Sequence, residues 1–95
     1  MYEVGYSGRV LDAMRELIAR NPGRGLQLLT ALRLADYRFR IYPQFGQPLH
    51  DLSVGSAQLW VGVVAPLVFH YVLDEGQRRV SILRPPMPLP RTGIV

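Results

Sequence analysis

Residues 59–83, with the sequence LWVGVVAPLVFHYVLDEGQRRVSIL, decide the fold. They contain three short runs rich in β-branched and aromatic residues, at 59–64, 67–73 and 79–83. Residues 65–66 and 74–76 separate the runs and are typical of turns, and we expect Gly76 to adopt a positive φ in a three-residue hairpin loop. This pattern predicts an antiparallel meander of three strands.

The middle run of this stretch is apolar on both faces. One face carries Leu67, Phe69, Tyr71 and Leu73, and the other carries Val68, His70 and Val72. A strand with so little polar surface is typical of the centre of a sheet. We therefore expect residues 67–73 to form the central strand.

Two amphipathic helices are predicted before the meander. A short strand at 2–6 comes first, and Ser7 is then placed to cap a helix that runs from Gly8 to about Asn21. The sequence Asn-Pro-Gly at 21–23 ends that helix. A second helix is expected from about Gly25 to Tyr42, with one apolar seam formed by Leu28, Leu32, Ala35, Phe39 and Tyr42. The short connection predicts an antiparallel helical hairpin that covers the sheet.

The remaining segments are predicted to be irregular. Residues 43–49 are expected to form a structured loop with Phe45 and Leu49 tucked beneath it. Four prolines within residues 85–90 predict an extended, polyproline-like tail at 85–95, which either hangs free or binds a groove in a partner. A single domain then spans residues 1–84. Its fold class is α+β in the order β-α-α-β-β-β, with the helical hairpin packed on a small, mainly antiparallel sheet.

Composition constrains the partners. The chain has 95 residues, which is enough for one core, and 48% of them are apolar. All eleven basic residues are arginines, against seven acids, a bias that codon usage in a GC-rich genome would produce. Residues 76–95 nevertheless hold four arginines and no acid. This end of the molecule carries a positive field, so the expected partners are nucleic acid, an acidic protein or nothing specific.

Several classes of protein are disfavoured. The chain has no cysteine, so no disulfide is predicted. Its two histidines lack close carboxylate spacing, so no metal site is predicted, and no cofactor is expected. No glycine-rich phosphate loop precedes a helix, and residues 55–56 lack the second glycine of a nucleophile elbow. The longest apolar stretch, at 59–73, is interrupted by Pro66 and is shorter than a membrane span. We expect a cytoplasmic bacterial protein without a signal peptide and without a membrane partner.

The chain resembles the RelE/ParE superfamily of bacterial type II toxins. The resemblance covers residues 2–86 and rests on the element order, on Tyr6-Ser7 before the first helix, on YPQFGQPLHDL at 42–52, and on LVFHYVL at 67–73 before a basic strand. It implies the fold described above and a cognate antitoxin wrapped around it. It also implies one of two activities, which are cleavage of messenger RNA in the ribosome or poisoning of DNA gyrase.

The sequence departs from the pattern of the RNA-cutting members at three places. Those members usually carry an arginine near the start of the middle strand, where this chain has Val68. Their preceding strand is basic, whereas residues 58–63 carry no positive charge. Their C-terminal catalytic tyrosine has no counterpart, because no tyrosine follows Tyr71, which matches a structural tyrosine of the family. Arg84 lies in the region of another family arginine.

His50 and His70 are the candidates for the proton transfers that RNA cleavage requires. Cleavage needs a base for the 2′-hydroxyl, positive charge for the phosphate, and an acid for the leaving oxygen. His70 in an apolar strand is also consistent with a packed residue that makes one hydrogen bond. His50 stands beside Asp51, which could orient its imidazole, although neighbours in sequence seldom meet well.

Arginines are the candidates for binding a phosphate backbone, because their planar fork pairs with phosphate. Arg78, Arg79 and Arg84 form the strongest cluster, in which Arg84 is expected on the face of Arg78, opposite Arg79. Arg84 is also a catalytic candidate, whereas a charged edge strand that resists aggregation is the alternative. Arg38 and Arg40, together with Arg33, are candidates on the second helix or members of a solvated face. Trp60 could stack on a base but is more typical of a core residue.

The sequence therefore leads to three hypotheses. The first is a RelE/ParE-like toxin or toxin-derived protein, neutralised by an acidic or amphipathic antitoxin segment on the sheet and helical hairpin. Within it, the missing family arginine and C-terminal tyrosine disfavour efficient cleavage of messenger RNA. The second is a gyrase inhibitor, which needs surface shape rather than a catalytic cluster. The third is a catalytically inactive interaction module with the same fold.

Overall fold

The computed structural model describes the backbone of residues 1–95 and the side chains of residues 1–49 and 53–95. Its fold is α+β, as predicted, with two helices and six strands. In chain order the elements are β1 (Glu3–Tyr6), α1 (Gly8–Arg20), α2 (Gly25–Ile41), β2 (Gln47–Val54), β3 (Ala57–Val64), β4 (Leu67–Asp74), β5 (Arg79–Ile82) and β6 (Met87–Pro88). Short 3₁₀ turns at Pro22–Arg24 and Pro43–Phe45 follow the two helices.

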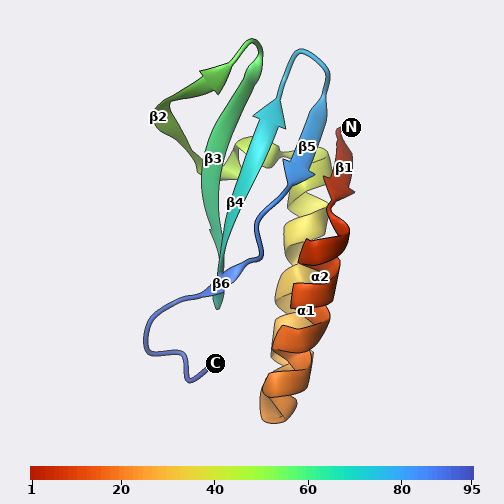
Figure 1. The fold of residues 1–95 in the computed structure, drawn as a ribbon, viewed down its shortest axis with the longest axis vertical. Coiled ribbons are helices and arrows are strands. Elements are labelled where there is room, and N and C mark those ends of the chain that lie inside the picture. The colour runs from red at the N-terminus through yellow and green to blue at the C-terminus, as the bar shows by residue number, and fades with distance from the viewer.

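The strands form one mixed sheet with β4 near its centre. The order is β1-β5-β4-β3-β2, and β6 pairs with the first residues of β4 (Figure 1). Only the pair β1 and β5 is parallel; β2 to β6 are joined by antiparallel pairing. The predicted meander is confirmed as β3, β4 and β5, and the predicted central strand is β4.

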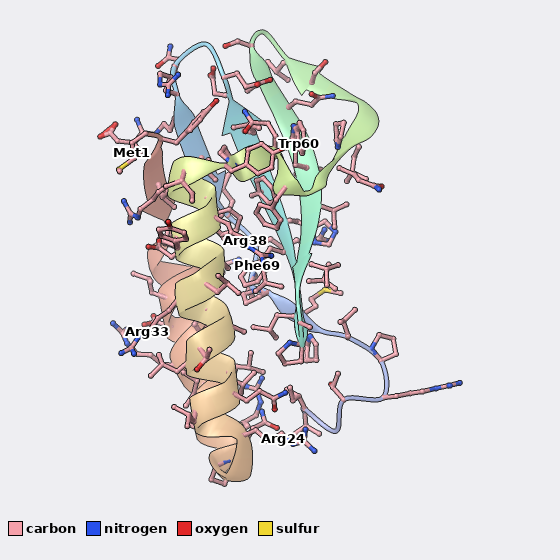
Figure 2. All side chains as sticks on the ribbon, turned by 180° about the vertical axis from the view of Figure 1, so that it is seen from behind. Met1, Arg24, Arg33, Arg38, Trp60 and Phe69 are labelled. Atoms are coloured by element: carbon pink, nitrogen blue, oxygen red, sulfur yellow. The ribbon has the colours of Figure 1, made fainter. Side chains whose placement is uncertain are left out.

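Both helices pack on one face of the sheet. In Figure 1 strand β5 passes in front of α2, and in the reverse view of Figure 2 α2 lies in front of β5. The side chains of β4 alternate between buried and half-buried, and the buried set faces the helices. An aromatic cluster lies between the layers, where the ring of Phe39 is 5.6 Å from that of Phe69 and 4.9 Å from that of Tyr71. Trp60 is buried at 8% exposure, so the core interpretation of this residue is confirmed.

The helix boundaries agree with the sequence pattern to within one residue. Ser7 caps α1 as predicted, because its hydroxyl accepts a hydrogen bond from Val10 N at 3.2 Å. One residue of the predicted apolar seam of the second helix, Tyr42, is not buried. Tyr42 is 59% exposed, because α2 ends at Ile41 and the extended backbone of Tyr42 (φ −152°) turns its side chain away from the core.

The sequence predicted irregular structure over most of residues 47–54. This prediction is wrong, because these residues form strand β2. It pairs with β3 through a tight turn in which Gly55 adopts a φ of +60°. The register runs from Val54↔Ala57 to Gln47↔Val61 and shifts between Pro48 and Ser53. A bulge of this kind lets a segment interrupted by polar residues and a proline remain in a sheet.

The β4–β5 connection also differs from the prediction. Its residue with positive φ is Arg78 (+53°), not Gly76, and the turn covers residues 75–78. Asp74 stabilises it, because one carboxylate oxygen accepts hydrogen bonds from Ser56 Oγ at 2.6 Å and from Gln77 N at 2.9 Å. The Asp74 carboxylate, rather than a glycine with positive φ, therefore stabilises this longer turn.

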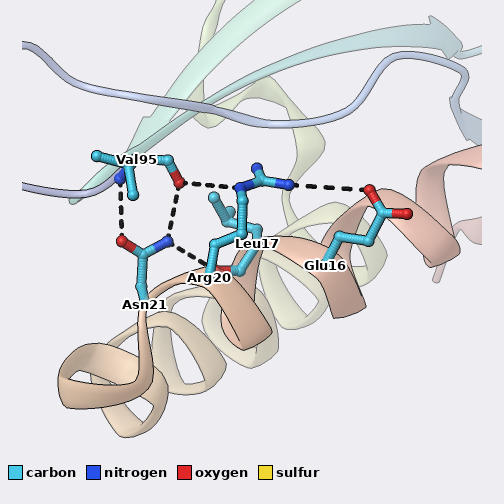
Figure 3. A network of polar contacts seen from close by, with 5 residues as sticks. All are labelled: Glu16, Leu17, Arg20, Asn21 and Val95. Carbon is cyan, nitrogen blue, oxygen red and sulfur yellow. Dashed lines mark hydrogen bonds and ion pairs between the residues drawn. The ribbon is translucent and has the colours of Figure 1, made fainter.

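The C-terminal segment returns to the domain instead of hanging free. Leu89 N donates to Pro66 O at 2.8 Å, and Ile94 is buried against the core. Figure 3 shows how Asn21 holds the backbone of Val95, since its Oδ1 accepts from Val95 N and its Nδ2 donates to Val95 O, each at 2.9 Å. Pairing and a buried asparagine thus tie residues 87–95 to β4 and to the end of α1. Within the described chain, no helix has the length and hydropathy to span a membrane.

Candidate functional site

The face of the sheet opposite the helices carries His70, one of the catalytic candidates. Its side chains on β3 and β4 are half-buried or exposed, and all but His70 and Asp74 are apolar: Ala57, Leu59, Val61, Val63, Val68, His70, Val72 and Asp74. We call this surface the outer face. Val63 is 51% exposed there. An apolar patch left open to solvent is typical of an interaction surface.

His70 is the titratable group at the middle of the outer face. It lies on β4 opposite Val61 of β3 and is half-buried. Its Nδ1 is buried and has no hydrogen-bond partner among the described side chains. Burial lowers the pKa of His70 below its usual value of 6.5, and the positive charge of Arg84 lowers it further. The imidazole is therefore neutral at pH 7 and able to accept a proton.

Arg84 lies beyond the end of β5. The alternation that predicts Arg84 on the face of Arg78 does not apply, because both residues lie outside β5. The strand ends at Ile82, and the exposed Arg84 follows in the bend toward β6, near enough for its charge to act on His70. The positive charge of Arg84 therefore acts on the imidazole of His70.

The other two arginines of the predicted cluster are separated from this pair. Arg78 lies at the end of the β4–β5 turn, with its guanidinium 4.8 Å from the ring centre of Tyr2. Arg79 is exposed on β5, and its register partners on the two neighbouring strands are Asp74 and Glu3. Two acids in register with Arg79 reduce the positive field at that end of the sheet.

Arg38 and Arg40 belong to the helical layer rather than to the outer face. The guanidinium of Arg40 donates two hydrogen bonds to Asp36, at 2.9 and 3.2 Å, and Arg38 lies 5.6 Å from the ring centre of Phe45. Tyr6 Oη also donates to Asp36, at 2.5 Å. Burial acts to raise the pKa of Asp36, but the hydrogen bonds from Arg40 and Tyr6 outweigh it and the pKa is lowered.

His50, the remaining candidate, has its backbone in β2. Its side chain, like that of Asp51, lies outside the described residues.

Sequence reasoning missed a pocket of about 400 Å³ between the two helices. It is lined by Tyr6, Leu11, Met14, Leu32, Arg33, Asp36 and Phe69. The helical periodicity places Leu11 and Met14 in the buried stripe of α1, which gives no sign that the helices separate here. We call it the interhelical pocket. Within the described residues, no group of histidines and carboxylates is arranged to hold a metal ion.

The sequence matches no family model and no curated protein sequence. Among solved structures, the chain is similar to one in the crystal structure of the archaeal RelE–RelB complex from Pyrococcus horikoshii OT3. The two share 17% sequence identity with a TM-score of 0.60, over 96% of this chain and 98% of the other. The chain therefore has a RelE-like fold.

Proposed function

We propose that the protein is a RelE-like toxin that cleaves RNA on the outer face and is held inactive by a cognate antitoxin protein. The observation that supports an RNA substrate is a neutral His70 on a sheet face that the helices leave uncovered, within reach of the positive charge of Arg84. The similar archaeal chain was solved as a RelE–RelB complex, which supports a protein partner.

In this proposal, His70 and Arg84 divide the chemistry of cleavage. Neutral His70 takes the proton from a ribose 2′-hydroxyl, whose oxygen then attacks the adjacent phosphorus. The bond to the 5′-oxygen breaks, and that oxygen takes a proton from water. The guanidinium of Arg84 binds the phosphate and stabilises its charge in the transition state.

The first test is expression from a tightly repressed promoter in bacteria, with growth, bulk translation, message integrity and DNA supercoiling followed together. We expect growth arrest with loss of translation and cleaved messages. His70→Gln and Arg84→Gln should each lower the cleavage rate by about a hundredfold or more, the typical contribution of a general base or an electrostatic stabiliser. Arg15→Gln, at an exposed arginine of α1, is the matched control and should arrest growth like the parent.

Two other outcomes would replace this proposal. Arrest with DNA damage while translation continues would indicate a gyrase inhibitor. Normal growth with abundant folded protein would indicate a catalytically inactive interaction module. The module has specific support, because the outer-face side chains of β3 from Leu59 to Val63 are apolar, and so are Val68 and Val72 on β4.

A further inference from the structure

The apolar surface of the outer face continues across three strands. Residues that lie opposite one another in a sheet share a face, so Val63 of β3, Val68 of β4 and Met87 of β6 form one apolar row. Leu59 and Val72 form a second row. Val63 is 51% exposed and Met87 is 49% exposed. In Figure 1 no helix lies in front of β3 or β4, so the described part of the chain leaves these rows open to a partner.

The side chains in these rows suit a second sheet. Most of them are valines, and branched aliphatic residues of this kind fill the space between the two sheets of a β-sandwich, whose inner faces lie about 10 Å apart. RNA is bound chiefly through its phosphates, so it does not account for the apolar rows. A flat apolar sheet face is best covered by another flat apolar sheet face.

The charges beside the apolar rows are compatible with a second copy of the chain. Arg79 lies in register between Asp74 on one neighbouring strand and Glu3 on the other. When two such rows meet, each Arg79 has carboxylates of the other copy within reach, and like charges need not face one another. The helical layer is different, because α1 and α2 contain three arginines each against three acids in all. Two copies that met through their helices would repel each other.

The size of the outer face sets the strength of such an association. Strands β3 and β4 contain eight residues each. At the usual spacings along and between strands, these two strands and their neighbours present about 500 Å² per copy, and about 1,000 Å² in a pair. This area is at the lower end of specific protein interfaces, so we expect a reversible dimer with a dissociation constant on the order of micromolar.

We propose that the outer face is the interface between two copies of this chain in a reversible homodimer. The two sheets pack face to face about a two-fold axis, so that the same apolar rows of both copies meet. The dimer covers His70, and only the monomer presents this residue to a substrate. That last consequence rests on the proposed function, whereas the dimer itself does not.

Analytical ultracentrifugation of the full chain tests the interface. We expect monomers at about 1 μM and dimers at about 1 mM. Val63→Glu should raise the dissociation constant at least about tenfold, because its carboxylate would be buried without a partner. Val63→Thr keeps the β-branched shape that suits a strand and should still weaken the dimer severalfold. Leu26→Glu, at a leucine of α2 that is 81% exposed, is the matched control and should leave the dissociation constant unchanged.

Methyl NMR spectra recorded over the same concentrations locate the contact. We expect the methyl signals of Val61, Val63 and Val68 to shift as dimers form, while those of Leu26 stay in place. A chain that stays monomeric throughout, equal weakening by Val63→Glu and Leu26→Glu, or shifts confined to the helices would overturn the inference. If RNA shifts the outer-face methyls of a chain that never dimerises, RNA is the occupant instead. A toxic protein that stays monomeric loses only the dimer, whereas a harmless one that dimerises loses only the toxin proposal.

Discussion

At Gly46 the chain passes so close to β3 and β4 that no side chain fits. A Cβ at this position would overlap Val61 O and would lie 2.6 Å from Tyr71 Oη, which donates a buried hydrogen bond to Pro43 O at 2.7 Å. Gly46→Ala must displace backbone or break that bond. We expect it to lower the free energy of unfolding by about 2 kcal/mol or more, measured by urea denaturation.

Gly8→Ala is the matched control for this residue. The substitution is chemically the same, but nothing lies within 4 Å of the new Cβ, and Gly8 is the first residue of α1. Because alanine favours helix over glycine, stability should be unchanged or slightly higher. Equal losses in the two variants would mean that Gly46 is not limited by space.

Among the elements, the C-terminal segment depends most on a single distant side chain. Asn21 is 6% exposed and donates to Leu17 O at 2.7 Å as well as to Val95 (Figure 3). Asn21→Ala removes these bonds and leaves the Val95 amide without its acceptor. We expect Val95 N–H to lose its protection from hydrogen exchange, while Leu89 N–H, bonded to Pro66 O, keeps its own.

Arg20→Gln is the control for the hydrogen bonds between Asn21 and Val95. Arg20 Nε reaches Val95 O only at 3.4 Å and from an exposed position, so its loss should change exchange little. If the Val95 amide exchanged freely in the parent protein, this would contradict its hydrogen bond to Asn21.

The elements also show what sequence patterns can and cannot predict. Helical spacing in α1 and α2 and apolar runs in β3, β4 and β5 have local causes, so their bounds follow from the residues themselves. Strand β2 contains Pro48 and polar residues without alternation, and it forms because β3 offers a pairing edge. Residues 87–95 show no period either, since Asn21, 74 positions away, fixes Val95. Long-range partners of this kind leave no local signal.

At the scale of the whole molecule, the outer face was predictable in part. The alternation of β4 identifies His70 as lying opposite Phe69 and Tyr71, and the structure agrees. The position of Arg84 was not predictable, because it depends on where β5 ends. The interhelical pocket depends on the separation of two helices, which periodicity within each helix does not encode.

The outer face should also give the whole molecule a pH-dependent stability. Burial and then the charge of Arg84 lower the pKa of His70 in the folded chain, whereas the unfolded value is near 6.5. The unfolded state therefore binds a proton more readily than the folded state. Stability is fully present above about pH 6.5 and declines as the pH falls from there toward the lower folded pKa.

His70→Gln should remove this decline, because the amide does not titrate. We expect the free energy of unfolding of the parent, measured in urea from about pH 8 to about pH 5, to fall below about pH 6.5 while that of His70→Gln stays level. Arg84→Gln should show a smaller decline, since it removes one of the two causes of the lowered pKa. Asp36 does not interfere with this measurement, because its pKa is lowered from 3.8 and its contribution to stability is lost only at more acidic pH.

Parallel declines in the parent and in His70→Gln would mean that the imidazole is not desolvated on the outer face, and the proposed base would lose its physical support.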